Sequence, residues 1–254
     1  MAKEKQKIGL ALGGGAVLGA AHIGVLKAFE ENDIRLAALT GTSIGAFIAA
    51  LYAFGKSADE ISEFVHELDW LDVTSLSLSK FGLLSNEKMG ERLTEILGEV
   101  CFDQAKIPFA LVATDLSSGK KELLKQGEVA RAVTASACVP GIFAPVDLDG
   151  CMLVDGGLLE NVPISPLADL GAELTIGVDL SANRRFQPPE DLIDVLTSSI
   201  DIALDNATRI QTSDADFVIK PELAAYSRTD TSKTDALIAE GHKAALVCLD
   251  ELFG

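Results

Sequence analysis

Short apolar runs alternate along the chain with longer segments whose apolar residues recur every three or four positions. The short runs predict buried strands, and they are Ile8 to Leu12, Leu36 to Thr40, Phe109 to Ala113, Leu174 to Val178 and Phe217 to Ile219. The periodic segments predict helices, and they are Val17 to Glu31, Ala46 to Phe54, a helix from Ser57 toward Leu68, Asn86 to Leu97, Val129 to Cys138, Pro163 to Gly171, Leu192 to Ile210 and Thr234 to Leu252. Because the two kinds alternate from end to end, we expect an α/β fold, a three-layer α/β/α sandwich around a mostly parallel central sheet.

Local turn signals refine this pattern. Asp149-Gly150 lies between two short apolar runs and predicts a hairpin of Val146 to Leu148 with Met152 to Val154. Ser57 followed by Glu60 predicts a capping box at a helix start. The chain contains no internal repeat and no low-complexity linker, and 254 residues suit one large α/β domain. We therefore expect residues 1–254 to form a single domain.

Composition and charge limit the partners. Hydrophobic residues make up 48% of the chain and the mean hydropathy is +0.28, which excludes a mainly disordered state. The net charge of −17 argues against nucleic acid, since lysines and arginines must neutralise phosphates. It also argues against electrostatic docking on anionic lipid, but it leaves a transient apolar contact with a membrane open.

The cysteines and the N-terminus bear on location. The four cysteines form no CxxC pair, so we expect free, buried thiols in a reducing compartment. Lys3, Lys5 and Lys7 precede the uncharged run Ile8 to Ala21, which resembles a secretory signal. Five glycines break that run, and it would make a poor apolar helix. No apolar segment is long enough to span a bilayer, and we expect a cytoplasmic protein.

The first chemical motif is Gly41-Thr42-Ser43-Ile44-Gly45, between a predicted strand and a predicted helix. A G-x-S-x-G in this context is typical of a nucleophile elbow, in which the glycines let the chain turn so sharply that the serine projects clear. Ser43 would then lie at the positive end of the following helix, where a backbone N–H such as that of Ile44 points at an oxyanion. A plain tight turn with an unreactive serine is the alternative.

The second motif is the glycine-rich stretch Gly13 to Gly19, also at a strand-to-helix turn. A dinucleotide-binding loop is one interpretation, although the Rossmann glycine spacing fails at Leu18 or at Ala16. The other is an oxyanion hole built from successive backbone N–H groups. Two such turns on neighbouring parallel strands would face each other across the carboxyl ends of the sheet, which favours the oxyanion hole. A non-catalytic nucleotide-binding module stays open.

A hydrolytic serine needs a base, and the sequence offers two kinds. Asp155 in Asp155-Gly156-Gly157 follows a predicted strand, and the glycines leave its carboxylate uncrowded. A Ser-Asp-His α/β-hydrolase would instead use His242, with Asp155 or Asp179 between it and Ser43 in chain order. His242 lies within a helical pattern, where a solvated face is its ordinary setting. His22 follows the glycine loop and either lines the site or packs beneath it.

Taken together, these motifs resemble the patatin-like phospholipase family, particularly its short bacterial members. The resemblance extends from Ile8 to about Val178 and rests on the three motifs in this order, with Ala113 to Leu116 and Ala135 to Phe143 as secondary marks. It implies a patatin-like fold and a Ser-Asp dyad without histidine, with Ser43 as nucleophile and Asp155 as general base. It further implies oxyanion-hole N–H groups from Gly14, Gly15 and Ala16, and acyl transfer from a fatty-acyl ester. It implies no metal and no cofactor.

The glycine loop departs from the family pattern at two positions. The family usually has Gly-Gly-Gly-x-Arg-Gly, whereas this chain has Ala16 in place of the third glycine and Leu18 in place of the arginine. If the loop needs a positive φ at residue 16, alanine costs on the order of 1 kcal/mol there. Loss of the arginine makes a neutral ester or a lysophospholipid relatively more plausible as the substrate. An inactivated member that binds lipid is a further alternative, and the apolar stretch Trp70 to Leu84 is a candidate lid.

Overall fold

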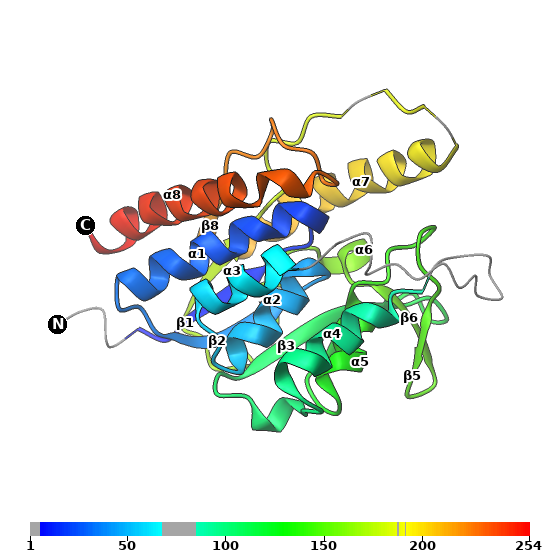
Figure 1. Cartoon of the computed structure of the whole chain (residues 1–254), viewed down its shortest axis with the longest axis horizontal. Coiled ribbons are helices and arrows are strands. Elements are labelled where there is room, and N and C mark those ends of the chain that lie inside the picture. Colours follow the sequence, from blue (N-terminus) through cyan, green and yellow to red (C-terminus); the bar gives the residue numbers. More distant parts are fainter. Residues whose placement is uncertain (1–5, 68–84, 187, 191) are drawn as a thin grey trace.

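The computed structural model describes residues 6–67, 85–186, 188–190 and 192–254. Its centre is an eight-stranded sheet of order β5-β6-β3-β2-β1-β7-β8, with β4 paired to β3 outside that path (Figure 1). The strands are β1 (Ile8–Leu12), β2 (Leu36–Gly41), β3 (Phe109–Asp115), β4 (Lys120–Leu124), β5 (Val146–Leu148), β6 (Cys151–Asp155), β7 (Leu174–Val178) and β8 (Phe217–Ile219). All five predicted parallel-type strands and the predicted hairpin are present.

The centre of the sheet is parallel and its β5-β6-β3-β4 end is antiparallel. β1 pairs in parallel with β2 and β7, β2 with β3, and β7 with β8. Every residue of β1 and β3 is buried, as expected for strands covered on both faces. The carboxyl ends of β1, β2 and β3 therefore meet at one edge of the sheet, where the predicted site residues follow.

The pairing of β3 brings β2 and β6 end to end. Leu111 of β3 pairs with Gly41 at the end of β2, and Ala113 pairs with Asp155 at the end of β6. β4 pairs with both of these β3 residues, so it occupies the opposite edge of β3. β2 and β6 consequently share one edge of β3. Their last residues, Gly41 and Asp155, pair with β3 residues that are two positions apart.

Helices cover both faces of the sheet, as predicted. They are α1 (Ala20–Glu31), α2 (Ile44–Ala53), α3 (Ala58–Glu67), α4 (Glu87–Leu97), α5 (Val129–Ser136), α6 (Gly157–Glu160), α7 (Leu192–Gln211) and α8 (Thr234–Phe253). α1, α2 and α8 bury the large core with the apolar side chains Ile8, Leu10 and Leu12 of β1. α8 lies along α1 across this face (Figure 1).

The opposite face carries a thinner layer. The side chains of Ala11 and Ala38 pack there on Val162, Ile164 and Leu167. The Thr40 and Thr42 hydroxyls on this face donate to the carbonyls of Pro163 and Glu160, and α7 packs on α6. The residues that form this layer therefore come shortly after Asp155 in the chain.

The helix predicted from Pro163 to Gly171 was wrong. Residues 165–171 form turns in which N–H groups bond three residues back, as from Leu167 to Ile164 and from Gly171 to Ala168. The physical reason is Pro166, which has no N–H to donate and disfavours a helical conformation in the residue before it. The apolar periodicity was real, but it serves the small core just described.

Other differences from the predicted elements are smaller. β4 and the one-turn α6 were not predicted, and residues Ala16–Gly19 form a 3-10 turn, so α1 begins at Ala20. α5 ends at Ser136, before Cys138. The capping box at Ser57 is confirmed, because its N–H donates to Glu60 Oε2 at 2.9 Å. The candidate lid Trp70 to Leu84 lies outside the described residues. Within them, no helix combines the length and the apolar character that a membrane crossing requires.

Candidate active site

Ser43 occupies a strained backbone position between β2 and α2. Its φ is 56° and its ψ is −124°, a left-handed conformation that non-glycine residues adopt at real cost. Gly45 makes this turn possible, since a Cβ there would lie 2.1 Å from the carbonyl oxygen of Leu12. The sharp strand-to-helix turn that the G-x-S-x-G motif predicts is therefore present, with Ser43 as the N-cap of α2.

Ser136 holds the backbone of the elbow, a role that the sequence did not predict. The Ser43 N–H donates to Ser136 Oγ at 3.0 Å, and the Ser136 hydroxyl donates to the carbonyl of Val112 at 2.7 Å. Ser136 is fully buried at the end of α5. One hydroxyl thus connects the strained residue to β3, and the only sequence signal was its place in the Ala135 to Phe143 run.

Asp155 lies within hydrogen-bonding reach of Ser43. Burial raises the pKa of its carboxyl to about 6, against the opposing effects of hydrogen bonds from the Gly157 N–H and the Ser43 hydroxyl and of the Arg228 charge. The Gly157 N–H donates to Asp155 Oδ1 at 2.8 Å. Gly156 fits because a Cβ there would lie 2.2 Å from the Val112 carbonyl oxygen. A carboxyl with a raised pKa beside a serine hydroxyl suits proton transfer near neutral pH.

The glycine loop lies directly against Ser43. A Cβ built on Gly14 would be 3.3 Å from Ser43 Cβ. The Gly14 N–H already donates to the Asn161 carbonyl at 3.2 Å, whereas the N–H groups of Gly15 and Ala16 meet no acceptor among the described residues. Of the three predicted oxyanion-hole positions, these two have N–H groups that remain available to a ligand.

Ala16 has the backbone conformation for which the family uses glycine. Its φ is 52°, in the left-handed region. Its side chain is exposed, so the alanine methyl fits sterically at the cost of backbone strain. Leu18 is buried in the following 3-10 turn.

The histidines have structural partners away from Ser43. His22 is buried and lies 2.7 Å from the Gly13 carbonyl oxygen through Nε2, and burial lowers its pKa to about 4. It therefore supports the base of the glycine loop as a neutral ring. His242 Nε2 lies 2.7 Å from Glu31 Oε2, at the end of α1 farthest from the glycine loop. The structure thus does not bring His242 to Ser43.

Asn161 connects the glycine loop to the Asp155 turn, and sequence reasoning missed it. Besides the carbonyl bond to Gly14, its side-chain Oδ1 lies 2.8 Å from the position of a Cβ on Gly14 and 3.3 Å from one on Gly157. The residue is buried. An amide six residues after an aspartate carries no distinctive sequence signal, so only the fold reveals its place.

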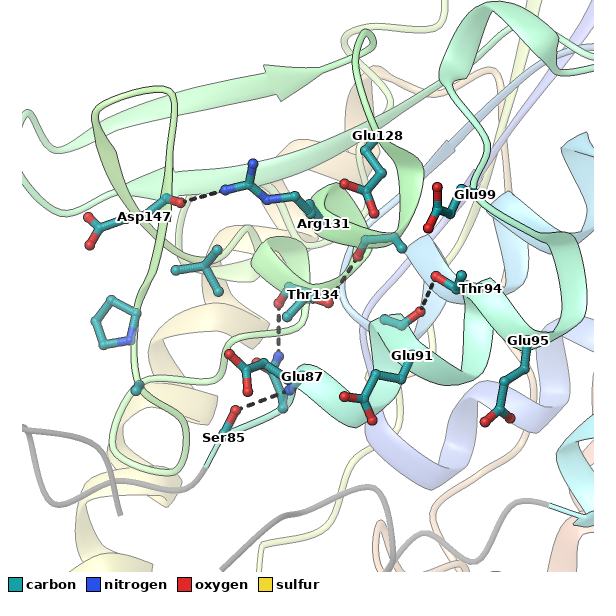
Figure 2. Close-up of a pocket in the computed structure, with 16 residues that line it drawn as sticks. Ser85, Glu87, Glu91, Thr94, Glu95, Glu99, Glu128, Arg131, Thr134 and Asp147 are labelled. Carbon is teal, nitrogen blue, oxygen red and sulfur yellow. Dashed lines mark hydrogen bonds between the residues drawn. The ribbon is translucent and has the colours of Figure 1, made fainter. Parts of the chain in front are cut away.

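A large hollow lies away from these residues. It is a groove of about 1020 Å³ between α4, α5 and the segment leading into β5 (Figure 2). Its carboxylates are Glu87, Glu91, Glu95, Glu99, Glu128 and Asp147. Arg131 is the one basic residue among the described residues that line it, and its guanidinium donates to the Asp147 carbonyl at 3.1 Å. A groove of this charge repels anionic ligands, and it contains neither Ser43 nor Asp155.

One group among the described residues has metal-ligand spacing, formed by Asp115, Glu122 and Cys151. Both oxygens of Asp115 already accept backbone N–H bonds, from Ser117, Ser118 and Met152. The Ser118 side chain, followed by these backbone bonds, lowers the pKa of the Asp115 carboxyl. The group has the features of a turn that fixes β3 against β4 and β6. All four cysteines are free; Cys138 and Cys248 are buried as predicted, whereas Cys101 is exposed and Cys151 is half-buried.

Residues 10–168 match the family model described as Patatin-like phospholipase, and that stretch contains the glycine loop, Ser43 and Asp155. The chain belongs to the patatin-like phospholipase family. The expected resemblance is thereby confirmed over nearly the length from which it was inferred.

Curated relatives from bacteria and from fungi align with about 70% of this chain. An uncharacterized NTE family protein of Mycobacterium tuberculosis is 37% identical over 180 residues, which cover 70% of this chain and 50% of that protein. Lysophospholipase nte1 of Aspergillus fumigatus is 31% identical over 183 residues, 69% of this chain and 12% of that protein. The chain thus aligns with half or less of the length of these curated relatives.

Solved structures show the same fold at low sequence identity. VipD from Legionella pneumophila superposes with a TM-score of 0.65 at 16% identity, over 97% of this chain and 67% of that one. The type III effector ExoU of Pseudomonas aeruginosa superposes with a TM-score of 0.51 at 17% identity, over 97% and 53%. This agreement confirms the patatin-like α/β fold.

Proposed function

We propose that this patatin-like protein is a serine lipid acyl hydrolase that cleaves fatty-acyl esters through Ser43 and Asp155. The observation that carries the proposal is the pair itself. A serine in a strained turn at a helix N-terminus lies beside a buried carboxylate whose pKa is raised to about 6 by burial. Membership in the family, and a relative named as a lysophospholipase, support ester hydrolysis of this kind.

In this mechanism Ser43 Oγ attacks the acyl carbonyl carbon while its proton passes to the Asp155 carboxylate. The carbonyl oxygen becomes an oxyanion, which the N–H groups of Gly15 and Ala16 stabilise, with Gly14 fixing the loop through its bond to Asn161. Asp155 then returns the proton to the departing alcohol, leaving an acyl-Ser43 ester. Water attacks this ester, Asp155 accepts a proton from the water, and the fatty acid leaves as Asp155 passes that proton to Ser43 Oγ.

The raised pKa answers the main chemical difficulty of such a dyad. A carboxylate with a pKa near 4 is a weak base for a serine hydroxyl. Burial moves the Asp155 pKa to about 6, which strengthens the base by roughly two orders of magnitude while leaving it mostly ionised at neutral pH. The helix N-terminus at Ser43 and the free loop N–H groups supply the remaining charge stabilisation.

We propose that the protein reaches its substrate through a transient apolar contact with lipid. α7 exposes an apolar face, on which the side chain of Leu192 is 72% exposed and that of Leu196 is 55% exposed, with Val195 and Ile202 beside them. The same helix packs on α6, which follows Asp155. A net charge of −17 supports contact through such a face over electrostatic attraction to anionic lipid. The four free thiols support a reducing, cytoplasmic location.

Labelling with a fluorophosphonate tests the proposal directly. We expect one adduct per chain, mapped by mass spectrometry to Ser43, and no adduct in Ser43→Ala. Asp155→Asn should label far more slowly and lose esterase activity on a short acyl ester. Ser199→Ala, at an exposed serine of α7, and His242→Asn serve as controls that keep both labelling and activity.

The outcomes separate the alternatives. Activity that survives Ser43→Ala would refute the serine mechanism. A strong loss in His242→Asn would support the Ser-Asp-His alternative. An intact, folded chain that neither labels nor hydrolyses would support a nucleotide- or lipid-binding member without catalysis.

A further inference from the structure

A pocket of about 610 Å³ lies beside the glycine loop, on the part of the chain that follows the family-model match. Leu18 of the loop and Leu180 form part of its wall. The Val17 N–H donates to the carbonyl of Arg228, another wall residue, at 3.2 Å. A Cβ on Gly15 would lie 2.7 Å from Leu180 Cδ1. The pocket therefore shares a wall with the loop that lies against Ser43.

The pocket is positively charged in a strongly acidic protein. Among the residues that the structure describes, three arginines line it, Arg184, Arg185 and Arg228, together with one carboxylate, that of Asp201. Asp205 pairs with Arg184 from outside the lining, so among these described groups three positive charges face two negative ones. A net positive pocket in a chain of net charge −17 concentrates anions at this one place.

The arginines retain unused hydrogen-bond donors. Arg228 Nη1 contacts both oxygens of Asp201, at 2.8 and 2.6 Å, whereas its buried Nε has no acceptor among the described residues. Arg184 lies 2.9 Å from Asp201 and 3.3 Å from Asp205. Arg185 is exposed and has no ion pair within the described part of the chain. A guanidinium carries five N–H donors, and the contacts with Asp201 use only Nη1 of Arg228, while no donor of Arg185 is used within the described part of the chain.

Part of the wall is apolar, with Phe186, Pro188, Pro189 and Leu223, and Ser198, Ser227 and Thr229 add hydroxyl groups. Charge from the pocket also reaches the candidate active site, since Arg228 lowers and Asp201 raises the pKa of Asp155. An anionic group on an apolar molecule, held here, would thus lie near an ester bound at Ser43. Guanidinium forks match phosphate oxygens in geometry and charge.

We propose that this pocket is a subsite for the phosphate of a lipid substrate, with Arg228 as its main contact and Arg185 as an additional cation. The inference rests on the proposed hydrolase function and concerns which esters the enzyme prefers. It assigns the phosphate contact to residues beyond the glycine loop, whose own position 18 is an uncharged leucine. Arg184 then acts as a positioning residue, because it fixes Asp201 beside Arg228.

The test compares two esters that differ only in the phosphate, 1-lauroylglycerol 3-phosphate and 1-lauroylglycerol, as monomers. We expect wild-type enzyme to prefer the phosphorylated ester in kcat/KM. Arg228→Gln should reduce that preference about tenfold, chiefly through KM, and Arg228→Lys should restore part of it. Arg185→Gln, which breaks no ion pair, should reduce the preference severalfold. Arg35→Gln, at an exposed arginine between α1 and β2, is the matched control and should leave it unchanged.

Each outcome decides the inference. Equal use of both esters by wild-type enzyme, or an unchanged preference in Arg228→Gln, would overturn the subsite while leaving the hydrolase proposal intact. Hydrolysis of neither ester would overturn both. If inorganic phosphate alters hydrolysis of 1-lauroylglycerol but Arg228→Gln does not change the preference, the pocket binds free anions and the substrate subsite is refuted.

Discussion

Replacing Asp155 with asparagine should make the protein more stable at neutral pH while it abolishes hydrolysis. The carboxyl has a pKa of about 6 in the folded protein against an ordinary value of 3.8, and burial is the main cause. The folded state therefore holds more protons than the unfolded chain between these values, and the free energy of unfolding falls as the pH rises through them. Above about pH 6 the full cost of burying the carboxylate, ~3 kcal/mol, is present. Asparagine has the same shape, keeps an acceptor for the Gly157 N–H and never ionises.

The pH dependence isolates this effect from other consequences of the substitution. Urea unfolding of wild type and Asp155→Asn should be compared from about pH 5 to about pH 7.5. Over that range the stability advantage of the variant should grow by about 1.4 kcal/mol, the part of the titration that lies above pH 5. His22, whose pKa is lowered to about 4, destabilises both proteins equally on acidification and cancels from the difference.

Ser43→Ala is the matched control, because it removes activity but keeps the carboxyl. Losing the Ser43 hydrogen bond should raise the Asp155 pKa further, so the pH-dependent loss of stability should persist or increase. A difference between wild type and Asp155→Asn that does not change with pH, or that shrinks as the pH rises, would refute the assignment of a raised pKa to Asp155.

Three further predictions follow from the same geometry. The kcat/KM for a neutral ester should fall below an apparent pKa of about 6, since only ionised Asp155 accepts the Ser43 proton, and a pH profile without this limb would contradict the base assignment. Ala16→Gly should stabilise the protein by about 0.5 kcal/mol in urea, as relief of the left-handed strain exceeds the added chain entropy; the same change at Ala203, exposed on α7, should instead cost about 1 kcal/mol. Leu196→Ser should weaken binding to neutral phosphatidylcholine vesicles severalfold in a sedimentation assay, without loss of hydrolysis of a soluble short-chain ester, and unchanged sedimentation would exclude the α7 contact.

The parts of the fold predicted correctly are those where burial alone fixes the pattern. β1 and β3 are buried on both faces and appear as continuous apolar runs, and α2 is as apolar as a helix between a sheet and its neighbours must be. β4 went unpredicted because its sequence, Lys-Lys-Glu-Leu-Leu, lies half in solvent and is stabilised by pairing with β3. For residues 163–171 the error was the reverse, because a helix was predicted where none forms. The helical spacing of the apolar residues there serves packing on Ala11 and Ala38.

For the candidate site, sequence motifs identified the residues but not the contacts that hold them. Ser43 and Asp155 are 112 positions apart, and only the change of partner along β3 brings the ends of β2 and β6 together. Ser136 and Asn161 are ordinary polar residues whose roles depend on that meeting. Long-range contacts also decide which N–H groups of the glycine loop stay free. The N–H of Gly14 is not free, because it donates to the carbonyl of Asn161.

The position of Ala16 connects these observations to a trade-off between stability and function. The elbow at Ser43 and the loop at Ala16 both hold non-glycine residues at positive φ, and Asp155 is a carboxylate buried against its preference for water. Each feature destabilises the folded chain by on the order of 1 to 3 kcal/mol. A fold that only needed to be stable would place glycine at both backbone positions and a neutral side chain at the third. The three destabilising residues, Ser43, Ala16 and Asp155, lie together at the edge of the sheet where β1, β2 and β6 end. This clustering is the pattern expected when backbone strain and charge burial serve a reaction.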